Sequence, residues 1–555
     1  MRAKPERSYD IFLSHKSHLM PLTPNKNSNA HAAFTNPHLP LRRSKQGIAP
    51  CRTRLRPRVA FIHPPAHRDR LRMVQNSTIE NEQNSTETHE YSWLNNWFPV
   101  TFAADVDEKP FSFSIFSKRY VLFRDADGEY VVFDDVCPHR AAPLSEGRVV
   151  TSVGEDGKRK SHIECIYHGW RFDSCGQCVR VPQSPPEKPI PSQCNIRQRY
   201  PTTIILNKLI VVYLGDCSDA NFGRLPVPEQ LQTSFETCEL FRSMARSMPV
   251  SFDAVFENVV DPLHVSWAHH GTSQGNRNID FSKSQVKTSS RSVSSFVSEV
   301  RLPRFSNPIH IEFRPPTYAS YKFAFGYLLF WFAPTTADSC ILFTTLASKE
   351  PSFLVKAMIR TIPEWTRHGD VNVVLDGDTA LLRYQVDNLL FKKNDVYDAT
   401  WKQNYYLGAS QIDSAVFHFR KWLDENVDSI PFTRAELEAA KISSSTKLDK
   451  RYINDRYEHH TKNCSCCSAA LRNARRIRTV AVILALVLLS VCVGSFVAMI
   501  MISRAVGNSV ASSFVGWITT MMVLCLSLVL VIVVSSRVIG SLTFTTRAQY
   551  LQHTD

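Results

Sequence analysis

Acidic residues are scarce at the start of the chain: residues 1–75 contain 15 Lys or Arg but only three acids, Glu6, Asp10 and Asp69. This excess accounts for 12 of the 14 net positive charges. The rest of the chain is nearly neutral, so no nucleic-acid partner is indicated. The segment also lacks the apolar run of a secretory signal. Its Arg-rich composition with many Ser, Pro and Asn predicts a transit peptide, or else a disordered basic tail, at residues 1–80.

Charge is absent from two later stretches, residues 479–502 and 514–534. Each is apolar and long enough to cross a bilayer, so we expect two transmembrane helices in contact with membrane lipid. The loop between them offers only Arg504, whereas more arginines lie outside both stretches: Arg472, Arg475, Arg476, Arg478, Arg537 and Arg547. This asymmetry predicts that both flanks, and with them the preceding domains, lie on one side of the membrane.

The chain also lacks a disulfide framework, although it contains 14 cysteines. Two of them belong to the mixed pairs Cys137-Pro138-His139 and Cys165-Ile166-Tyr167-His168. Two thiolates on one iron and two imidazoles on the other are the ligand set of a Rieske [2Fe–2S] centre. Tetrahedral zinc accepts the same four ligands, but short zinc modules usually pair Cys with Cys and His with His. An iron–sulfur cluster implies a reducing compartment.

The flanking sequence favours the cluster, because Cys137-Pro138-His139-Arg140 and Tyr167-His168-Gly169-Trp170 are similar to the two cluster-binding loops of Rieske proteins. Short β-rich runs separated by turns predict a small antiparallel β domain over residues 91–215. Gly128 marks one hairpin turn. The charged segment 153–160 predicts a surface insertion between the two loops, which costs little loop entropy.

A second group of potential metal ligands follows about a hundred residues later, where Asp261-Pro262-Leu263-His264 precedes His269. In a continuous helix these two histidines would lie about 140° apart, so they can close on one metal only where the helix bends or ends. Two neutral imidazoles and a carboxylate form the facial triad of non-haem Fe(II) oxygenases. Such a triad leaves coordination positions open for O2 and substrate.

In these motifs the chain resembles the Rieske-type non-haem iron oxygenases, specifically the plastid group that contains pheophorbide a oxygenase. The resemblance covers roughly residues 91–540 and also rests on Val181-Pro182-Gln183 and Glu257-Asn258-x2-Asp261-Pro262-x-His264. It implies an α+β fold: an N-terminal antiparallel β Rieske domain at 91–215, a helix-grip-like α+β catalytic domain at 216–445, and a C-terminal pair of transmembrane helices.

The resemblance also implies roles for individual residues. The cluster ligands would be Cys137, His139, Cys165 and His168. His264 and His269 would hold the mononuclear iron with a later carboxylate, for which we expect Asp378 in the helix start at Gly377-Asp378, with Asp376 as the fallback. Asn258 and Asp261 would be catalytic. In a homotrimer Asp261 would join His168 of one subunit to His264 of the next, unless it only caps a helix.

Cys464 and Cys467 have the Cys-x2-Cys spacing of a redox-active dithiol, within His459-His460-Thr461-Lys462-Asn463-Cys464-Ser465-Cys466-Cys467. Pheophorbide a oxygenase and its closest relatives carry a similar element before their membrane anchor. The intervening Cys466 leaves open which thiols would pair, and a zinc site or palmitoylation are alternatives. We expect this motif in a linker at residues 446–478.

The predicted activity is oxygenation of a chlorophyll-derived tetrapyrrole with O2 and electrons from ferredoxin. Ring opening of pheophorbide a in chlorophyll breakdown is the leading reaction, at the inner envelope or thylakoid membrane of a plastid, with the catalytic domain in the stroma. The aromatic run Lys322–Phe332 is expected to be a strand that walls a flat substrate or packs in the core. The alternatives are hydroxylation of protochlorophyllide or phyllobilins, sterol oxidation outside plastids, and a non-enzymatic redox sensor of the plastid import translocon.

Overall fold

The computed structural model describes residues 91–544 apart from 154–156, 158, 216–224, 229–230, 232–238, 273–274, 293–294, 304, 349–350, 393–412, 446–449 and 507–510. The predicted transit peptide at 1–80 lies outside the described residues, as does most of the tip of the predicted insertion at 153–160.

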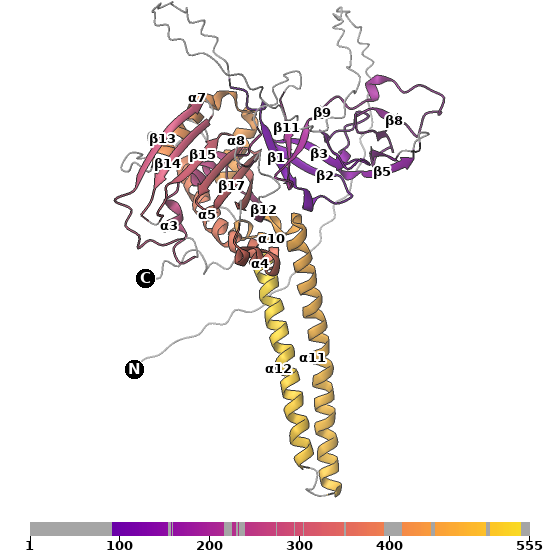
Figure 1. Cartoon of the computed structure of the whole chain (residues 1–555). Coiled ribbons are helices and arrows are strands. Elements are labelled where there is room, and N and C mark those ends of the chain that lie inside the picture. The colour runs from indigo at the N-terminus through magenta and orange to yellow at the C-terminus, as the bar shows by residue number, and fades with distance from the viewer. Residues whose placement is uncertain are drawn as a thin grey trace, which may run out of the picture. The chain divides into compact units, whose positions relative to one another are not determined.

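Three antiparallel sheets form the N-terminal part of the fold (Figure 1). The first sheet has the strand order β1 (Trp97–Phe102), β11 (Leu209–Tyr213), β10 (Thr202–Ile205). The second sheet has the order β2 (Phe111–Ile115), β3 (Lys118–Arg124), β4 (Tyr130–Asp134), β9 (Arg199–Tyr200). The third sheet has the order β5 (Arg148–Val153), β6 (Arg159–Glu164), β7 (Arg171–Phe172), β8 (Cys178–Arg180). Pairing of β1 with β11 joins the two ends of this segment. Gly128, with φ of 86°, makes the predicted turn between β3 and β4.

Strand β1 packs this N-terminal part against the sheet that follows it in the chain. All six of its residues are buried. Because successive side chains of a strand point to opposite faces, Phe98 and Val100 enter one hydrophobic core while Trp97 enters another. An irregularity in the pairing with β11 between Pro99 and Thr101 shifts the alternation, so that Phe102 enters the same core as Trp97. Both cores also contain side chains of the following sheet, so the two parts are held together by burial of apolar surface on both faces of β1.

A seven-stranded antiparallel sheet forms the next part, with helices packed against it (Figure 1). Its order is β12 (Glu239–Met248), β18 (Ser339–Ser348), β17 (Gly326–Thr336), β16 (Tyr318–Phe323), β15 (Ile309–Arg314), β14 (Ser295–Arg301), β13 (Gln285–Ser292). The prediction of one strand over Lys322–Phe332 was wrong. The run contains the end of β16, a turn and the start of β17, because Gly326 adopts a φ of 154° that a β-branched or aromatic residue cannot adopt without strain.

The helices of this part are α2 (Phe252–Val260), α3 (His264–Ala268), α4 (Phe353–Thr361), α5 (Glu364–Lys392), α7 (Ser414–Asn426) and α8 (Arg434–Ser445). Helix α5 contacts β12 and α2. The prediction that a helix starts at Gly377-Asp378 was wrong, because Asp378 lies in the middle of α5. Tertiary packing overrides the low helix propensity of Gly369 and Gly377.

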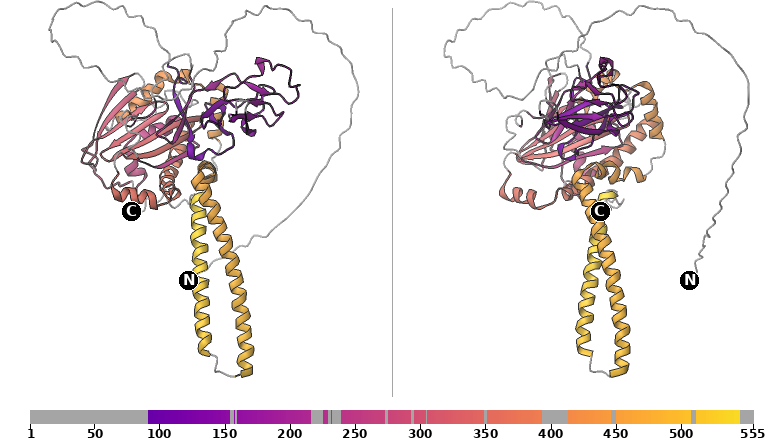
Figure 2. Two further views of the ribbon diagram at one scale, coloured as in Figure 1. Left: turned by 45° about the vertical axis from the view of Figure 1, so that its right-hand side comes forward. Right: turned by 90° about the vertical axis from the view of Figure 1, so that its right-hand side faces the viewer.

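Two long apolar helices, α11 (Ser465–Val506) and α12 (Ala511–Thr543), lie side by side in all views (Figures 1 and 2). By length and composition both are candidate membrane spans, at Ser465–Ala505 and Gly516–Thr543, and only 6% of the apolar window of each is buried in protein. The apolar side chains therefore point outward, as in a bilayer.

The expected linker at 446–478 is helical instead in its described part. It contains α9 (Lys450–Ile453), α10 (Arg456–His459), the 3-10 turn η7 (Thr461–Asn463) and the beginning of α11. Arg456 and Thr461 fasten this region to the end of α12: an Arg456 Nη donates to the Ser541 carbonyl at 2.8 Å, and the Thr461 hydroxyl to the Leu542 carbonyl at 2.6 Å.

Candidate functional site

The two Cys-His loops have the same backbone geometry. In the first, the Cys137 carbonyl accepts from the Ala141 amide at 2.9 Å and the Cys137 amide donates to the Ala142 carbonyl at 2.8 Å. In the second, Cys165 makes the equivalent bonds with Gly169 and Trp170, both at 2.9 Å. The fifth residue of each loop has a positive φ, 56° at Ala141 and 70° at Gly169. These matched turns present each cysteine and its histidine toward one point.

The side chains of the loops fit a Rieske cluster. The rings of His139 and His168 lie 4.5 Å apart, and the indole of Trp170 stacks on His139 at 4.5 Å and 4°. The Nδ1 of His139 is buried without a hydrogen-bond partner among the described residues. Burial raises the pKa of Cys137 to about 12. A thiolate at this position therefore needs a cationic partner such as iron.

The structure also brings together His264, His269 and Asp378. The donor atoms of the three side chains all lie within 4.8 Å of one another. The Asp378 Oδ1 is 3.1 Å from the Nε2 of His269 and 3.9 Å from the Nε2 of His264. The Asp378 oxygen and the His269 nitrogen are buried and make no hydrogen bond within the described chain. Such orphaned, converging donor atoms fit a metal ion bound by two imidazoles and one carboxylate.

Local backbone geometry orients the two histidines. Helix α3 begins at His264 and ends at Ala268, so the helix ends before His269, as the spacing of the two histidines requires. The Nδ1 of His264 lies 2.6 Å from the carbonyl of Asp261. An N–H donated there leaves Nε2 free to bind a metal, which is the usual arrangement of ligating histidines.

The backbone of Gly275 packs directly against the backbone of His269. A Cβ at this position would lie 2.2 Å from the His269 carbonyl group, so only glycine allows the backbones to approach this closely.

The carboxylate of Asp261 accepts from the Leu263 amide at 2.9 Å. The Asp261 side chain thus closes a turn just before α3. The N-cap position of α3 is Leu263, without a side-chain cap hydrogen bond, so the expected alternative of helix N-capping by Asp261 is not observed. Its Coulombic or hydrogen-bonding contacts to a second subunit stay a prediction.

The fallback ligand Asp376 points elsewhere. One carboxylate oxygen pairs with Arg246 at 2.6 Å and the other with Arg456 at 2.5 Å. All three side chains are almost fully buried. Asp376 therefore compensates two buried guanidinium groups, whereas Asp378, two residues further along α5, faces the histidines.

The histidines and Asp378 line a cavity of about 430 Å³. This is within the range of small-molecule sites. Asn258 also lines it, and aromatic side chains form much of its wall: Phe281, Phe305, Tyr321, Phe323, Phe325 and Phe330. Part of the aromatic run around residues 322–332 thus serves the cavity, whereas Trp331 and Phe332 are fully buried in the cores.

Arg242 is a lining residue that the sequence did not reveal. It has a φ of 58° at an irregularity in the pairing of β12 with β18 between Phe241 and Met244. A positive φ at a non-glycine residue costs about 1–3 kcal/mol, and such strain is often found at functional sites. Its Nε is buried without a hydrogen-bond partner in the described chain.

Glu257, the first residue of the Glu-Asn-x2-Asp motif, stabilises the scaffold. It forms an ion pair with Arg420 of α7, which also binds Asp253 at 2.7 Å. Burial raises the pKa of Glu257, against the opposing effect of Arg420. This pair holds α2 against α7, next to the stacked rings of Phe256 and Phe419, and thereby positions the Asn258 end of α2.

Cys464 and Cys467 lie in a third group of potential ligands, with His460 and His368. His460 is close to the cysteines in sequence, whereas His368, on α5, is 96 residues away from Cys464 and was not among the predicted residues. No local spacing connects them, so only the fold could show this group.

Residues 96–201 match the family model described as the Rieske [2Fe-2S] domain. A Rieske domain joined to a His-His-carboxylate site defines the class of Rieske non-haem iron oxygenases.

Two relatives are pheophorbide a oxygenases. The chain is 30% identical over 410 residues to the protein of Oryza sativa subsp. japonica, covering 70% of this chain and 74% of that one. It is 28% identical over 456 residues to that of Arabidopsis thaliana, covering 77% and 82%. Protein TIC 55 of Pisum sativum is 25% identical over 442 residues, covering 73% and 75%. The chain therefore belongs to the family of Rieske non-haem iron oxygenases that contains pheophorbide a oxygenase and TIC 55. The predicted α+β fold, enzyme class and [2Fe–2S] cofactor are thus confirmed.

Proposed function

We propose that the protein is a membrane-anchored plastid oxygenase that uses O2 and ferredoxin-derived electrons to oxygenate a chlorophyll-derived tetrapyrrole, with ring opening of pheophorbide a as its leading reaction. The observation that carries this proposal is the aromatic cavity in which His264, His269 and Asp378 converge. The names of the relatives supply the leading substrate.

The residues divide into two ligand sets. Cys137, His139, Cys165 and His168 hold the cluster, and the convergent triad holds one iron. When bound, the cluster supplies electrons and the iron activates O2. The protein's own contribution is to fix the imidazoles through backbone contacts, as the Asp261 carbonyl does for His264, and to surround the open side of the triad with apolar walls that exclude water.

The cavity suits a large flat substrate that carries an acid group. The aromatic side chains Tyr321, Phe323 and Phe330 offer surfaces for a conjugated macrocycle. Arg242 adds a cationic group at the same cavity. The propionate side chain of pheophorbide a provides a matching carboxylate, and a guanidinium binds carboxylates through parallel hydrogen bonds.

Exposed apolar side chains at both metal sites support a homotrimer in which subunits exchange electrons. Ile166 and Tyr167, beside the cluster ligand His168, are 70% and 59% exposed. Trp267, between the two triad histidines, is 56% exposed. Burial of these surfaces against each other would bring His168 near Asp261 of the adjacent subunit, in agreement with the role implied for Asp261.

The expected location is a plastid membrane. All three reported relatives are described as chloroplastic, and the two C-terminal helices expose apolar surface. The arginines in the first turns of α11, before its apolar part, and after the apolar part of α12 favour a stromal catalytic domain.

The test is incubation of the full-length protein, in detergent, with reduced ferredoxin, 18O2 and a panel of pheophorbide a, protochlorophyllide and linear phyllobilins. We expect 18O in an opened product of pheophorbide a, and none with Asp378→Ala. Incorporation only into another substrate would refute the ring-opening reaction, and no incorporation into any would refute oxygenation of tetrapyrroles.

The second candidate is a non-enzymatic redox component of plastid protein import, which the likeness to TIC 55 and the thiols near the membrane helices favour. Iron analysis separates the two functions. The oxygenase requires about three irons per chain, two in the cluster and one in the triad. A content of about two would favour the redox component.

A further inference from the structure

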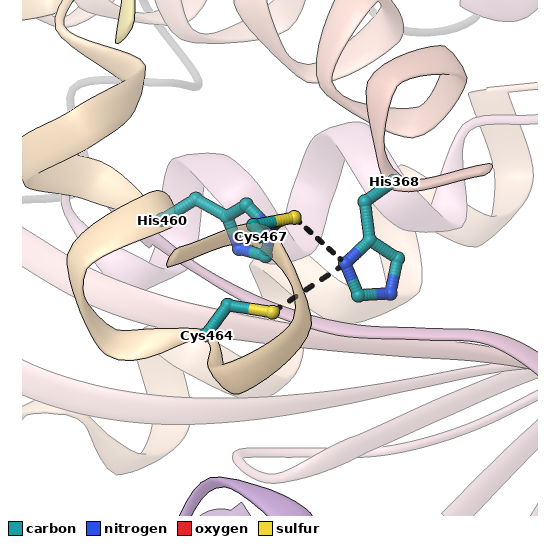
Figure 3. A group of neighbouring side chains, drawn as sticks. All are labelled: His368, His460, Cys464 and Cys467. Atoms are coloured by element: carbon teal, nitrogen blue, oxygen red, sulfur yellow. Dashed lines mark hydrogen bonds between the residues drawn. The ribbon is translucent and has the colours of Figure 1, made fainter. Parts of the chain in front are cut away.

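The third ligand group lies where the membrane helices meet the catalytic domain. His368 comes from α5, His460 from the end of α10, and Cys464 and Cys467 from the start of α11. The sulfurs of both cysteines point toward the ring of His368, with His460 alongside (Figure 3). All four side chains are at most 6% exposed. Four donor atoms from three segments thus converge in a buried position.

The spacing of the donor atoms is that of a tetrahedral metal site. Ligands of tetrahedral zinc, with Zn–S of about 2.3 Å and Zn–N of about 2.0–2.1 Å, place sulfur and nitrogen roughly 3.6 Å apart. The Nδ1 of His368 lies 3.6 Å from the Cys464 sulfur and 3.4 Å from the Cys467 sulfur. The Nε2 of His460 lies 3.3 Å from the Cys467 sulfur.

The backbone fixes His460 in the ligating tautomer. Its Nδ1 lies 2.7 Å from the carbonyl oxygen of Ala245 in β12. Because a carbonyl oxygen only accepts hydrogen bonds, Nδ1 carries the hydrogen and donates the hydrogen bond. The lone pair of Nε2 then faces the sulfurs. A metal-ligating histidine almost always donates its other ring N–H in this way. For His368, Nε2 is buried without a hydrogen bond in the described chain and has the carboxylate of Glu364 at 3.9 Å.

We propose that His368, His460, Cys464 and Cys467 bind one structural Zn2+. Two thiolates balance the charge of the ion, and two neutral imidazoles complete the tetrahedron without adding charge, which suits a buried site. Thiolate and imidazole ligands favour zinc over magnesium or calcium. All four coordination positions are protein side chains, as in structural rather than catalytic zinc sites.

The zinc ion joins the membrane anchor to the catalytic helix. Helix α5 carries His368 and, ten residues or about 15 Å further on, the candidate iron ligand Asp378. Asp105, from the 3-10 turn η1 (Ala103–Asp105), accepts from the Ser465 amide at 2.7 Å and so also ties the start of α11 to the N-terminal part. Zinc therefore holds α5, β12 and α11 in one arrangement beside the membrane.

A Cys464–Cys467 disulfide is the competing use of these residues. The cysteines are free thiols in the structure. A disulfide between them would leave both imidazoles without a metal ion to bind. A zinc ion explains all four side chains, whereas a disulfide explains two.

Metal analysis of the full-length protein, purified anaerobically in detergent from zinc-supplemented cells, tests the proposal. We expect about one zinc per chain besides iron, and an X-ray absorption spectrum at the zinc edge with two sulfurs at about 2.3 Å and two nitrogens at about 2.0 Å. This measurement needs no variant. A protein without zinc and with a Cys464–Cys467 disulfide, detected by alkylation and mass spectrometry, would overturn the proposal, as would iron in place of zinc.

Variants assign the ligands. Cys467→Ser and His460→Ala should each lose most of the zinc while the Rieske electron paramagnetic resonance signal persists, which shows that the N-terminal part remains folded. Cys466→Ser is the matched control: its sulfur lies 3.6 Å from His368 but outside the group of four, so zinc should be retained. Retention of zinc by both ligand variants would refute the assignment.

Discussion

Helix α5 contributes to two groups of potential metal ligands that differ in access. At Asp378 it meets two histidines, and the three donor atoms face a cavity of about 430 Å³. At His368 it meets one histidine and two cysteines, and none of these four residues lines that cavity. Three ligands beside a cavity leave room for reactants, whereas four buried ligands leave none. The count and burial of the candidate ligands therefore distinguish the proposed catalytic site from the proposed structural site on the same helix.

Loss of a triad ligand should have the largest effect. His264→Ala or Asp378→Ala removes one of three ligands, so turnover should fall to background and iron from about three to about two per chain. The measurement is product formation together with iron analysis. The Rieske electron paramagnetic resonance signal should be unchanged, and sustained turnover in either variant would contradict the triad.

Removal of the proposed zinc should act on stability instead. Cys464→Ser should lower the free energy of unfolding of the membrane-proximal region by on the order of 5 kcal/mol, because structural zinc contributes directly to folding. Limited proteolysis between α10 and α11 measures this loss. If the variant resists protease as well as the Cys466→Ser control does, the site does not hold this junction together.

Replacement of Asp376 tests whether its role differs from that of the nearby Asp378. Asp376→Ala leaves Arg246 and Arg456 buried without their shared carboxylate, at a cost of about 3–5 kcal/mol. The variant should unfold at lower temperature in a thermal melt but keep about three irons per chain when folded. Loss of the mononuclear iron alone, with unchanged stability, would reverse the roles of the two aspartates.

Replacement of Arg242 should change affinity more than rate. Arg242→Met removes a charged hydrogen-bond donor worth about 1.5–3 kcal/mol, so KM for a substrate with a free carboxylate should rise about 10- to 150-fold with little change in kcat. A methyl ester of the same substrate is the control and should bind both proteins alike. Equal loss for acid and ester would show that Arg242 only shapes the cavity.

The smallest effect is expected at the insertion between β5 and β6. Shortening residues 154–158 to a two-residue turn should change stability by no more than about 0.5 kcal/mol, because loop length has a small entropic cost. Iron content, zinc content and the thermal unfolding curve should match those of the unmodified protein. A loss of cluster signal would show that the insertion supports the cluster loops.

The sequence predicted features that depend on neighbouring residues and missed those that depend on distant ones. Cys137 and His139 are two residues apart, and the end of α3 before His269 could be inferred from the spacing of His264 and His269. The candidate carboxylate Asp378 was harder to place, because the family resemblance implied a helix start at Gly377-Asp378, where α5 instead continues.

His368 and Arg242 could not be found locally. His368 meets Cys464 only because α5 packs beside the start of α11, and Arg242 enters the cavity only because β12 is irregular at that point. Both positions result from long-range packing and strand register, which the neighbouring residues in the sequence do not predict.

Helix α5 has a consequence for how this sequence can vary in length. It presents His368, Asp376 and Asp378 in three directions set by one continuous helix. Insertion or deletion of one residue between His368 and Asp378 would turn one end by about 100° and shift it by about 1.5 Å relative to the other. The interval of ten residues should therefore be fixed, even where the side chains between these positions change.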